Sequence, residues 1–205
     1  LPNTMHLQWV KRAAEKGKHI LCEKPMGVSA AEEKKMFDYC RARGVRLMEA
    51  FAYLHSPVIR EIKRLTDAGE LGELRVVEAS FFTRGHYDHP DNIRARCETR
   101  GGALYDIGVY NISLAQYLFG REPEKVQATA HFMPSGVDDF STETLDFGDG
   151  RLAALTSGMC SHFARFSNFR VMGDAGWIDA PIEYNACGAQ SFTLRRADGT
   201  SETVT

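Results

Sequence analysis

The chain has 205 residues, of which 43% are hydrophobic, 25% are charged and 10% are aromatic. This composition is typical of a globular chain of one or two domains, and it excludes a disordered tail and a fibre. The chain has 25 Lys and Arg residues and 27 Asp and Glu residues, which gives a formal net charge of -2. Because there is no basic excess to neutralise phosphates, we expect no nucleic-acid partner.

The sequence also bears on the compartment. Its apolar stretches are strand-length, far below the roughly 18 consecutive residues that span a bilayer, so no membrane partner is expected. The number of cysteines is odd and no C-x-x-C is present, which favours a reducing compartment: Cys22, Cys40, Cys97, Cys160 and Cys187. We therefore expect a cytoplasmic protein. The chain begins without Met and without a basic and apolar leader, so we expect a cut start and no signal peptide.

The chain opens with a helix followed by a strand. Residues 4–16 carry apolar side chains at helical spacing, and Asn3 or Thr4 is expected to cap this helix. The short apolar run at 19–22 follows and is ended by a proline, which cannot donate to a ladder. This run predicts a buried strand.

A second helix and strand complete the first part. Ser29 and Glu32 form the S-x-x-E capping box that begins a helix, and residues 45–48 predict the next strand. A strand–helix–strand unit of this length implies parallel neighbours in a sheet covered by helices. Residues 1–50 are therefore predicted to be α/β.

The second part, residues 51–205, changes character. Ser56 with Pro57 predicts the start of a further helix. Strand lengths and compositions then recur between Gly, Pro and Asp turns, at 74–82, 126–132, 138–147, 151–158 and 166–172. Apolar and polar residues alternate at 126–132, which predicts a strand with one buried face and one solvent-exposed face. This part is predicted to be an α+β domain with a mainly antiparallel open sheet.

One long helix, predicted at 103–119, interrupts these strands. Its apolar residues surround most of the circumference, so it should be largely buried. Asp106 and Tyr110 are four apart on it and share one stripe. Burying a carboxylate and a phenol costs several kcal/mol unless each finds a partner. They either hydrogen-bond to nearby backbone or face a cleft.

Lys24 is the candidate partner across such a cleft. It belongs to the tripeptide E-K-P directly after a predicted strand, and ligands of α/β sheets bind outside the carboxyl ends of strands. An ordinary surface lysine is the alternative. If Lys24 faces Tyr110, its ammonium favours the phenolate and makes Tyr110 a general base.

Other motifs in the sequence give weaker evidence for a function. The loop His86-Tyr87-Asp88-His89 lacks paired cysteines and H-E-x-x-H, so we expect a contact to substrate or a neighbour rather than a metal site. Neither G-x-S-x-G nor a Walker loop is present, which argues against an α/β-hydrolase and a P-loop enzyme.

Six segments in the same order resemble the Gfo/Idh/MocA oxidoreductases over essentially the whole chain. They are L-P-N-T-M-H (1–6), H-I-L-C-E-K-P (19–25), V-R-L-M-E-A-F-A-Y (45–53), L-G-E-L-R-V-V-E-A-S-F (71–81), R-G-G-A-L-Y-D-I-G-V-Y (100–110) and F-R-V-M-G-D-A-G-W-I (169–178). The helix at 103–110 and the D-N-I-R loop at 91–94 look most like the branch of glucose-fructose oxidoreductase, D-xylose dehydrogenases and trans-dihydrodiol dehydrogenases.

The resemblance implies a domain organisation. Residues 1–50 would be the C-terminal remnant of an NAD(P)-binding Rossmann domain. Residues 51–205 would form the substrate domain, whose open sheet commonly makes the interface of a homo-oligomer. The G-x-G-x-x-G turn and the residue that selects NAD or NADP are absent from the sequence. We therefore expect a fragment truncated at both ends, inactive and unable to bind the cofactor alone.

The resemblance also assigns the site residues. Lys24, Asp106 and Tyr110 would be catalytic, with Lys24 close to both nicotinamide and substrate. The positions that would line NAD or NADP are Asn3, His6, Glu23, Lys24 and Pro25. No metal is expected.

The implied reaction is hydride transfer between nicotinamide and a hydroxyl carbon of a sugar or cyclic diol, an aldopyranose giving a lactone. Tyr110 would handle the hydroxyl proton, Lys24 would stabilise developing negative charge, and Asp106 would orient the substrate or Lys24. A non-catalytic relative that binds sugars or a partner is the alternative of a different class. Retention of all three residues together favours the enzyme.

Overall fold

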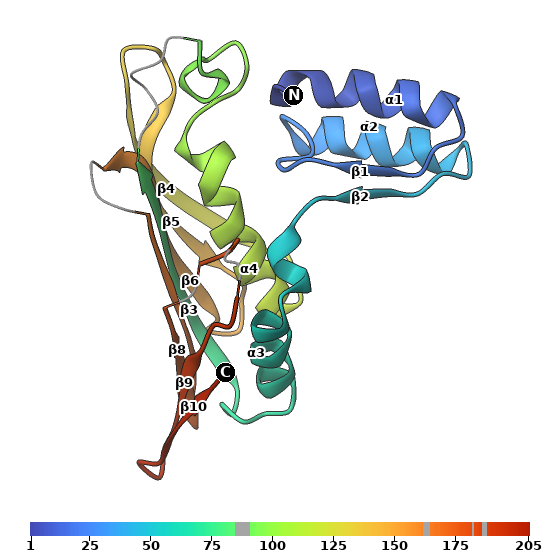
Figure 1. Cartoon of the computed structure of the whole chain (residues 1–205). Helices are drawn as coiled ribbons and strands as arrows, with labels where there is room; N and C mark the ends of the chain where they lie inside the picture. Colours follow the sequence, from blue (N-terminus) through green and yellow to red (C-terminus); the bar gives the residue numbers. More distant parts are fainter. Residues whose placement is uncertain (85–90, 162–164, 182, 186–187) are drawn as a thin grey trace.

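The computed structural model describes residues 1–84, 91–161, 165–181, 183–185 and 188–205. Its elements form two units with separate hydrophobic cores. The N-terminal unit packs helices against a two-stranded sheet, and the second unit packs helices against an eight-stranded sheet. Figure 1 shows the N-terminal unit projecting from the helix-covered side of the large sheet.

The N-terminal unit is the predicted strand–helix–strand arrangement with a helix before it. Strands β1 (Ile20–Cys22) and β2 (Leu47–Glu49) pair in parallel, which confirms that prediction. The helices are α1 (His6–Glu15) and α2 (Ala30–Arg41), after a 3-10 turn η1 (Asn3–Met5). They bury a small cluster under the sheet: Val10, Ala14, Cys22, Met26, Met36, Cys40 and Val45.

Two local predictions for this unit are wrong. Neither Asn3 nor Thr4 caps α1, because the chain enters through η1 and the N-cap, Met5, makes no side-chain bond. The Asn3 amide instead donates to the Arg100 carbonyl at 2.8 Å. The strand predicted as buried exposes 68% of Leu21, because α1 and α2 cover only one face of the pair.

The capping box is half formed. Ser29 Oγ accepts a hydrogen bond from the Glu32 backbone N–H at 3.2 Å, as predicted for the start of α2. Among the described residues, however, the buried Glu32 Oε1 has no partner, so the reciprocal bond of the box is missing.

The second unit contains the predicted antiparallel sheet. Its strand order is β10-β9-β8-β7-β3-β6-β5-β4, and the pair β3 with β6 is the parallel exception among the described strands. The strands are β3 (Leu74–Arg84), β4 (Lys125–Phe132), β5 (Asp138–Asp146), β6 (Leu152–Ser161), β7 (Phe166–Gly173), β8 (Gly176–Ala180), β9 (Phe192–Arg196) and β10 (Ser201–Val204).

Helices cover one face of this sheet. They are η2 (Ala52–His55), α3 (Pro57–Asp67) and α4 (Val109–Phe119), and Figure 1 shows α3 and α4 on the same side. Pro57 occupies the first turn of α3, as predicted. The main core lies between these helices and the sheet. Among the described residues, no helix is both long and apolar enough to cross a membrane.

The predicted helix at 103–119 is not a single α-helix. It begins with a π-helical turn, η4 (Leu104–Gly108), and continues as α4. The Asp138 carboxylate accepts from the Leu104 backbone N–H at 2.6 Å and so anchors the start of this turn. A Cβ on Gly108 would lie 2.7 Å from Ser157 Oγ, so the glycine lets the helix approach β6.

The prediction for residues 126–132 is also wrong in one respect. They form a strand, but both of its faces are largely exposed, with Val126 at 59% and Phe132 at 62%. The reason is position, because β4 is the last strand of the sheet. Alternation therefore identified the strand without identifying a buried face.

Candidate active site

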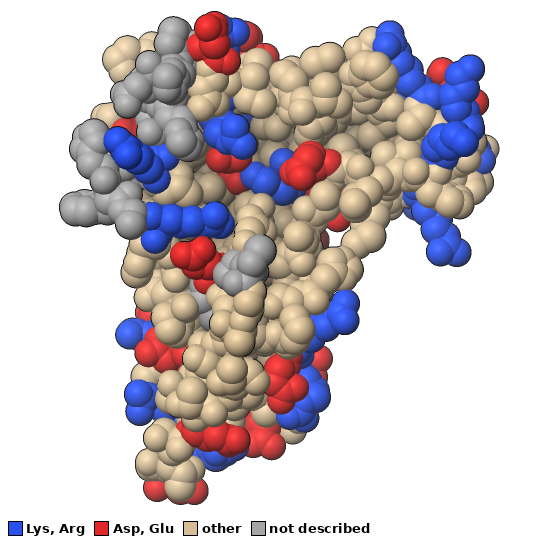
Figure 2. Space-filling model, in the orientation of Figure 1, with Lys and Arg blue, Asp and Glu red and all other residues tan. Residues whose placement is uncertain are grey.

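A cavity of about 590 Å³ lies where the two units meet. Its wall comes from the E-K-P loop after β1, from the end of β3 and from the segment 93–110. Figure 2 shows side chains of both charges side by side in the hollow between the units. The volume is within the range of about 300–1,000 Å³ that is typical of small-molecule sites.

The E-K-P loop is held in place by buried and partly buried polar groups behind it. Glu49 Oε1 accepts from the Met26 backbone N–H at 2.7 Å, and Glu33 Oε1 accepts from that of Gly27 at 3.3 Å. Burial raises the pKa of both carboxyls, and these backbone N–H bonds oppose the rise. The His6 ring is also anchored, with Nδ1 3.0 Å from the Pro25 carbonyl.

Lys24 and Asp106 meet across the two units. Lys24 Nζ lies 2.9 Å from Asp106 Oδ1 and also donates to the Asp106 backbone carbonyl. The two side chains are only 12% and 20% exposed. Lys24 Nζ lies 5.1 Å from the ring centroid of Tyr110, a cation–π distance. The structure therefore brings together the three residues predicted as catalytic, and all three line the cavity.

Tyr110 is embedded in an aromatic cluster. Neighbouring ring centroids lie 5.2–5.8 Å from its own, those of Phe51, Tyr53, Phe81 and Tyr184. Burial raises the pKa of Tyr53 and Tyr184, so both stay neutral phenols, and their hydroxyls donate to Ser113 Oγ and Asn111 Oδ1.

Tyr110 differs from these tyrosines in its hydrogen bonding. Asn185 Nδ2 donates to Tyr110 Oη at 3.1 Å, so the phenol oxygen acts as an acceptor. Tyr105 also lines the cavity, but its hydroxyl donates to the Val28 carbonyl at 2.9 Å. Among the described tyrosines of the cavity wall, Tyr110 is thus the one whose oxygen accepts a side-chain hydrogen bond.

The residues predicted to line the cofactor divide into two groups. Asn3, Glu23 and Lys24 line the cavity. His6 is buried behind the E-K-P loop and contacts the carbonyl of Pro25, which is the buried end of the loop, and among the described atoms the buried His6 Nε2 has no partner. The assignment of all five to a cofactor stays a prediction.

The sequence reasoning missed two polar residues that contact the predicted catalytic residues directly. Arg94 Nε lies 2.9 Å from Asp106 Oδ2, and Asn185 contacts Tyr110. Arg94 lies in the D-N-I-R loop, which served only to narrow the family branch. No sequence signal marked Asn185, which follows β8 in an irregular segment.

The loop of His86 to His89, for which the sequence predicts a contact to substrate or a neighbour rather than a metal site, lies outside the described residues. Within the described ranges, no group of three or more His, Cys, Asp or Glu side chains could hold a metal ion.

Known relatives match both units. A model described as "Oxidoreductase family, NAD-binding Rossmann fold" matches residues 1–51, and one described as "GFO/IDH/MocA C-terminal domain" matches residues 59–179. The dTDP-3,4-didehydro-2,6-dideoxy-alpha-D-glucose 3-reductase of Streptomyces violaceoruber is 36% identical over 100% of this chain and 60% of its own length. D-xylose 1-dehydrogenase (NADP(+)) 2 of Haloferax volcanii is 36% identical over 90% of the chain and 56% of its own length.

A solved structure agrees with these relatives. The aldose-aldose oxidoreductase of Caulobacter crescentus, complexed with glycerol, superimposes with a TM-score of 0.89 at 30% identity, covering 100% of this chain and 61% of that one. The chain therefore spans about 60% of the length of the relatives it matches. The matched models, together with the Rossmann-type unit and the open sheet, show that this chain belongs to the Gfo/Idh/MocA oxidoreductase family.

Proposed function

We propose that the protein carrying this chain is an NAD- or NADP-dependent oxidoreductase that acts on a hydroxyl carbon of a sugar or cyclic diol. The observation that carries the proposal is the convergence of Lys24, Asp106 and Tyr110 on one cavity, with Lys24 Nζ 2.9 Å from the carboxylate and 5.1 Å from the tyrosine ring. Relatives that bear the names of a sugar reductase and a xylose dehydrogenase support the substrate class.

The residues present fit a nicotinamide cofactor. The E-K-P loop lies at the carboxyl end of a parallel strand, where α/β sheets bind dinucleotides, and Glu23 and Lys24 face the cavity from it. The buried His6 Nε2, which has no partner among the described atoms, is a free polar group behind that loop. When bound, the nicotinamide would accept or supply the hydride.

Each catalytic side chain has a role that its contacts support. In oxidation, Tyr110 Oη acts in its phenolate form and takes the proton of the substrate hydroxyl while the hydride leaves the carbon, so that a carbonyl remains. In reduction, the Tyr110 phenol returns the proton to the substrate oxygen. The Lys24 ammonium stabilises the negative charge that develops on the substrate oxygen, and Asp106 fixes the ammonium in place.

Replacement of Lys24 tests this function. In the full-length protein, Lys24→Ala should lower kcat by roughly 100-fold or more, because a charge that stabilises the transition state is removed. Lys34→Ala is the control, since Lys34 is 76% exposed on α2 and pairs with Asp38. Turnover would be followed by NAD(P)H absorbance with pentoses, hexoses and cyclic diols. Equal turnover of Lys24→Ala and wild type would refute the assignment, and a binding module would bind sugars without turnover.

We further propose a boundary near residue 50, between the units 1–50 and 51–205, and a homo-oligomer formed through the uncovered face of the large sheet. Exposed apolar side chains on that face support the interface, among them Phe140, Leu152 and Phe166.

For the compartment, we propose a cytoplasmic location, which is supported by the free thiols of Cys22 and Cys40.

A further inference from the structure

The Asp106 carboxylate is held from both sides. Its Oδ1 atom accepts from Lys24 Nζ, and its Oδ2 atom accepts from Arg94 Nε, each at 2.9 Å. The ammonium belongs to the N-terminal unit, whereas the guanidinium belongs to the second unit. A carboxylate with one partner can turn about its terminal torsion, because such torsions are broad. A second partner on the other oxygen removes that freedom.

The backbone of Arg94 is itself fixed against the glycine pair Gly101-Gly102, which precedes η4. Its N–H donates to Asn92 Oδ1 at 3.0 Å, and its carbonyl accepts from the Gly102 N–H at 2.9 Å. A Cβ on Gly101 would lie 2.2 Å from that carbonyl oxygen, so only glycine permits this approach. The Asp106 N–H in turn donates to the Gly102 carbonyl at 3.0 Å. The backbones of Arg94 and Asp106 are therefore both hydrogen-bonded to Gly102 of the Gly101-Gly102 pair.

The contact is made by the Nε atom of the guanidinium. A glutamine side chain can place an N–H at about the same distance from the backbone, whereas a methionine of similar length offers no donor. The Arg94 side chain is 45% exposed, and an ion pair this exposed contributes little to folding stability. The contact should therefore matter for orientation more than for folding.

We propose that Arg94 is a positioning residue of the active site, which pins the Asp106 carboxylate so that it holds the Lys24 ammonium beside Tyr110. Arg94 acts through Asp106, and its effect on turnover rests on the function proposed above. When the Arg94 contact is lost, the Asp106 carboxylate turns away and the Lys24 ammonium keeps only its bond to the Asp106 backbone carbonyl. The ammonium then shifts from its place near the Tyr110 ring, and the developing charge loses its partner. Misplacement of a reacting group by about 1 Å can cost roughly 100-fold in rate.

Two substitutions separate positioning from charge. In the full-length protein, Arg94→Met should lower kcat by about 10-fold to 100-fold and change KM by less than about threefold. Arg94→Gln restores the N–H but not the charge, and should bring kcat back to within about threefold of wild type. Wild-type kcat in Arg94→Met would overturn the inference. A glutamine variant as slow as the methionine variant would overturn it as well.

Arg96→Met is the matched control, because Arg96 lies in the same loop and pairs with Asp91 at 3.0 Å, away from Asp106. It should leave kcat and KM unchanged, and a loss equal to that of Arg94→Met would contradict a specific role. Crystal structures of wild type and Arg94→Met supply a readout that needs no turnover. The Lys24–Asp106 Oδ1 contact should open beyond 4 Å in the variant, by the usual ion-pair limit. An unchanged contact refutes the inference, even if no sugar or diol is turned over.

Discussion

Glu143 lies on the helix-facing side of β5, 6% exposed, and among the described residues its Oε1 atom has no hydrogen-bond partner. Burial raises the pKa of this carboxyl, a hydrogen bond from Ser141 opposes the rise, and the nearby Asp138 carboxylate adds to it. The folded chain thus favours the protonated, uncharged form of Glu143.

We expect Glu143→Gln to stabilise the protein at pH 8 by about 1–3 kcal/mol, because the amide is uncharged and avoids the cost of burying a carboxylate. Because the folded chain holds the Glu143 proton more tightly than the unfolded chain, the wild type loses stability as pH rises through this raised pKa. The difference between variant and wild type should therefore shrink toward pH 4, where glutamate is protonated in both states. Chemical denaturation across this pH range measures it, and a difference independent of pH would contradict the burial of a charge.

At the residue scale, the sequence located three candidate catalytic residues that the structure brings together, but not all of the residues that contact them. Lys24 was placed by its position after a strand, and Asp106 and Tyr110 by their spacing on one helix. Arg94 and Asn185 reach the site from irregular segments, where no period relates one residue to the next. Their contacts depend on how the chain returns in three dimensions.

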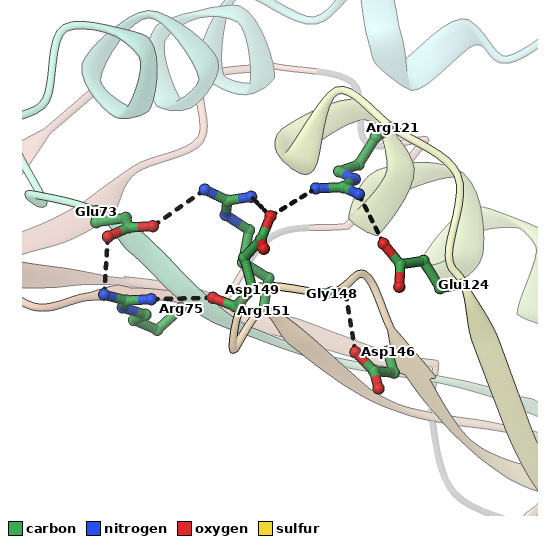
Figure 3. Close-up of polar contacts among 8 residues, drawn as sticks. All are labelled: Glu73, Arg75, Arg121, Glu124, Asp146, Gly148, Asp149 and Arg151. Carbon is green, nitrogen blue, oxygen red and sulfur yellow. Dashed lines mark hydrogen bonds and ion pairs between the residues drawn. The ribbon is translucent and has the colours of Figure 1, made fainter.

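Among the elements, the turn between β5 and β6 is tied to the start of β3 by a chain of ion pairs (Figure 3). Arg151 bridges Glu73 Oε1 at 3.0 Å and Asp149 Oδ2 at 3.3 Å. Arg75 also contacts Glu73, at 2.7 Å, and Arg121 contacts Asp149, at 3.2 Å. A network of several charges stabilises more than an isolated surface pair does.

We expect Arg151→Met to lower the free energy of unfolding by about 1 kcal/mol at low salt, because Arg151 is 27% exposed and holds two carboxylates. In about 1 M NaCl, where the Debye length is roughly 3 Å, most of this loss should disappear. Lys34→Met removes a more exposed contact, in which the Lys34 side chain is 76% exposed and Asp38 keeps its second partner, Arg41, and should cost less. Urea denaturation at both salt concentrations checks this, and a loss that persists in salt would assign the effect to packing.

The elements themselves were largely predictable, and their errors have a common cause. Helix and strand periods identified α2, α3 and β3 to β7. The solvent exposure of both faces of β4 is explained only by its position as the last strand of the sheet. The start of η4 is explained only by the hydrogen bond from the Leu104 N–H to Asp138. A local sequence pattern cannot predict which strands lie beside a given strand, nor a hydrogen-bond partner more than 30 residues away in sequence.

On the scale of the whole molecule, the large sheet has one face covered by α3 and α4 and one face without a helix among the described residues. Large apolar side chains on that open face include Phe140, Leu152 and Phe166, at 41%, 42% and 51% exposure. Grouped exposed apolar residues mark association surfaces in many proteins. The proposed homo-oligomer would cover them.

Light scattering of the full-length protein tests this interface. The wild type should have the mass of an oligomer, and Phe140→Glu combined with Phe166→Glu should shift it to the mass of the monomer, because two charges would be desolvated at the contact. Phe37→Glu is the control, since Phe37 is 42% exposed on α2 in the other unit. A double variant that keeps the wild-type mass would place the interface elsewhere, and a monomeric wild type would refute the oligomer.

The sequence by itself determined the parallel α/β unit, the antiparallel sheet and the family, because these follow from periodicity, turn chemistry and ordered motifs. It also predicted Lys24, Asp106 and Tyr110 as site residues through the resemblance to that family. Only the tertiary structure decided that Lys24 and Asp106, 82 residues apart, meet at 2.9 Å and that Arg94 closes the other side of the carboxylate. The physical reason is that burial and ion pairing act between neighbours in space. Those neighbours arise only when the two units pack together around the cavity.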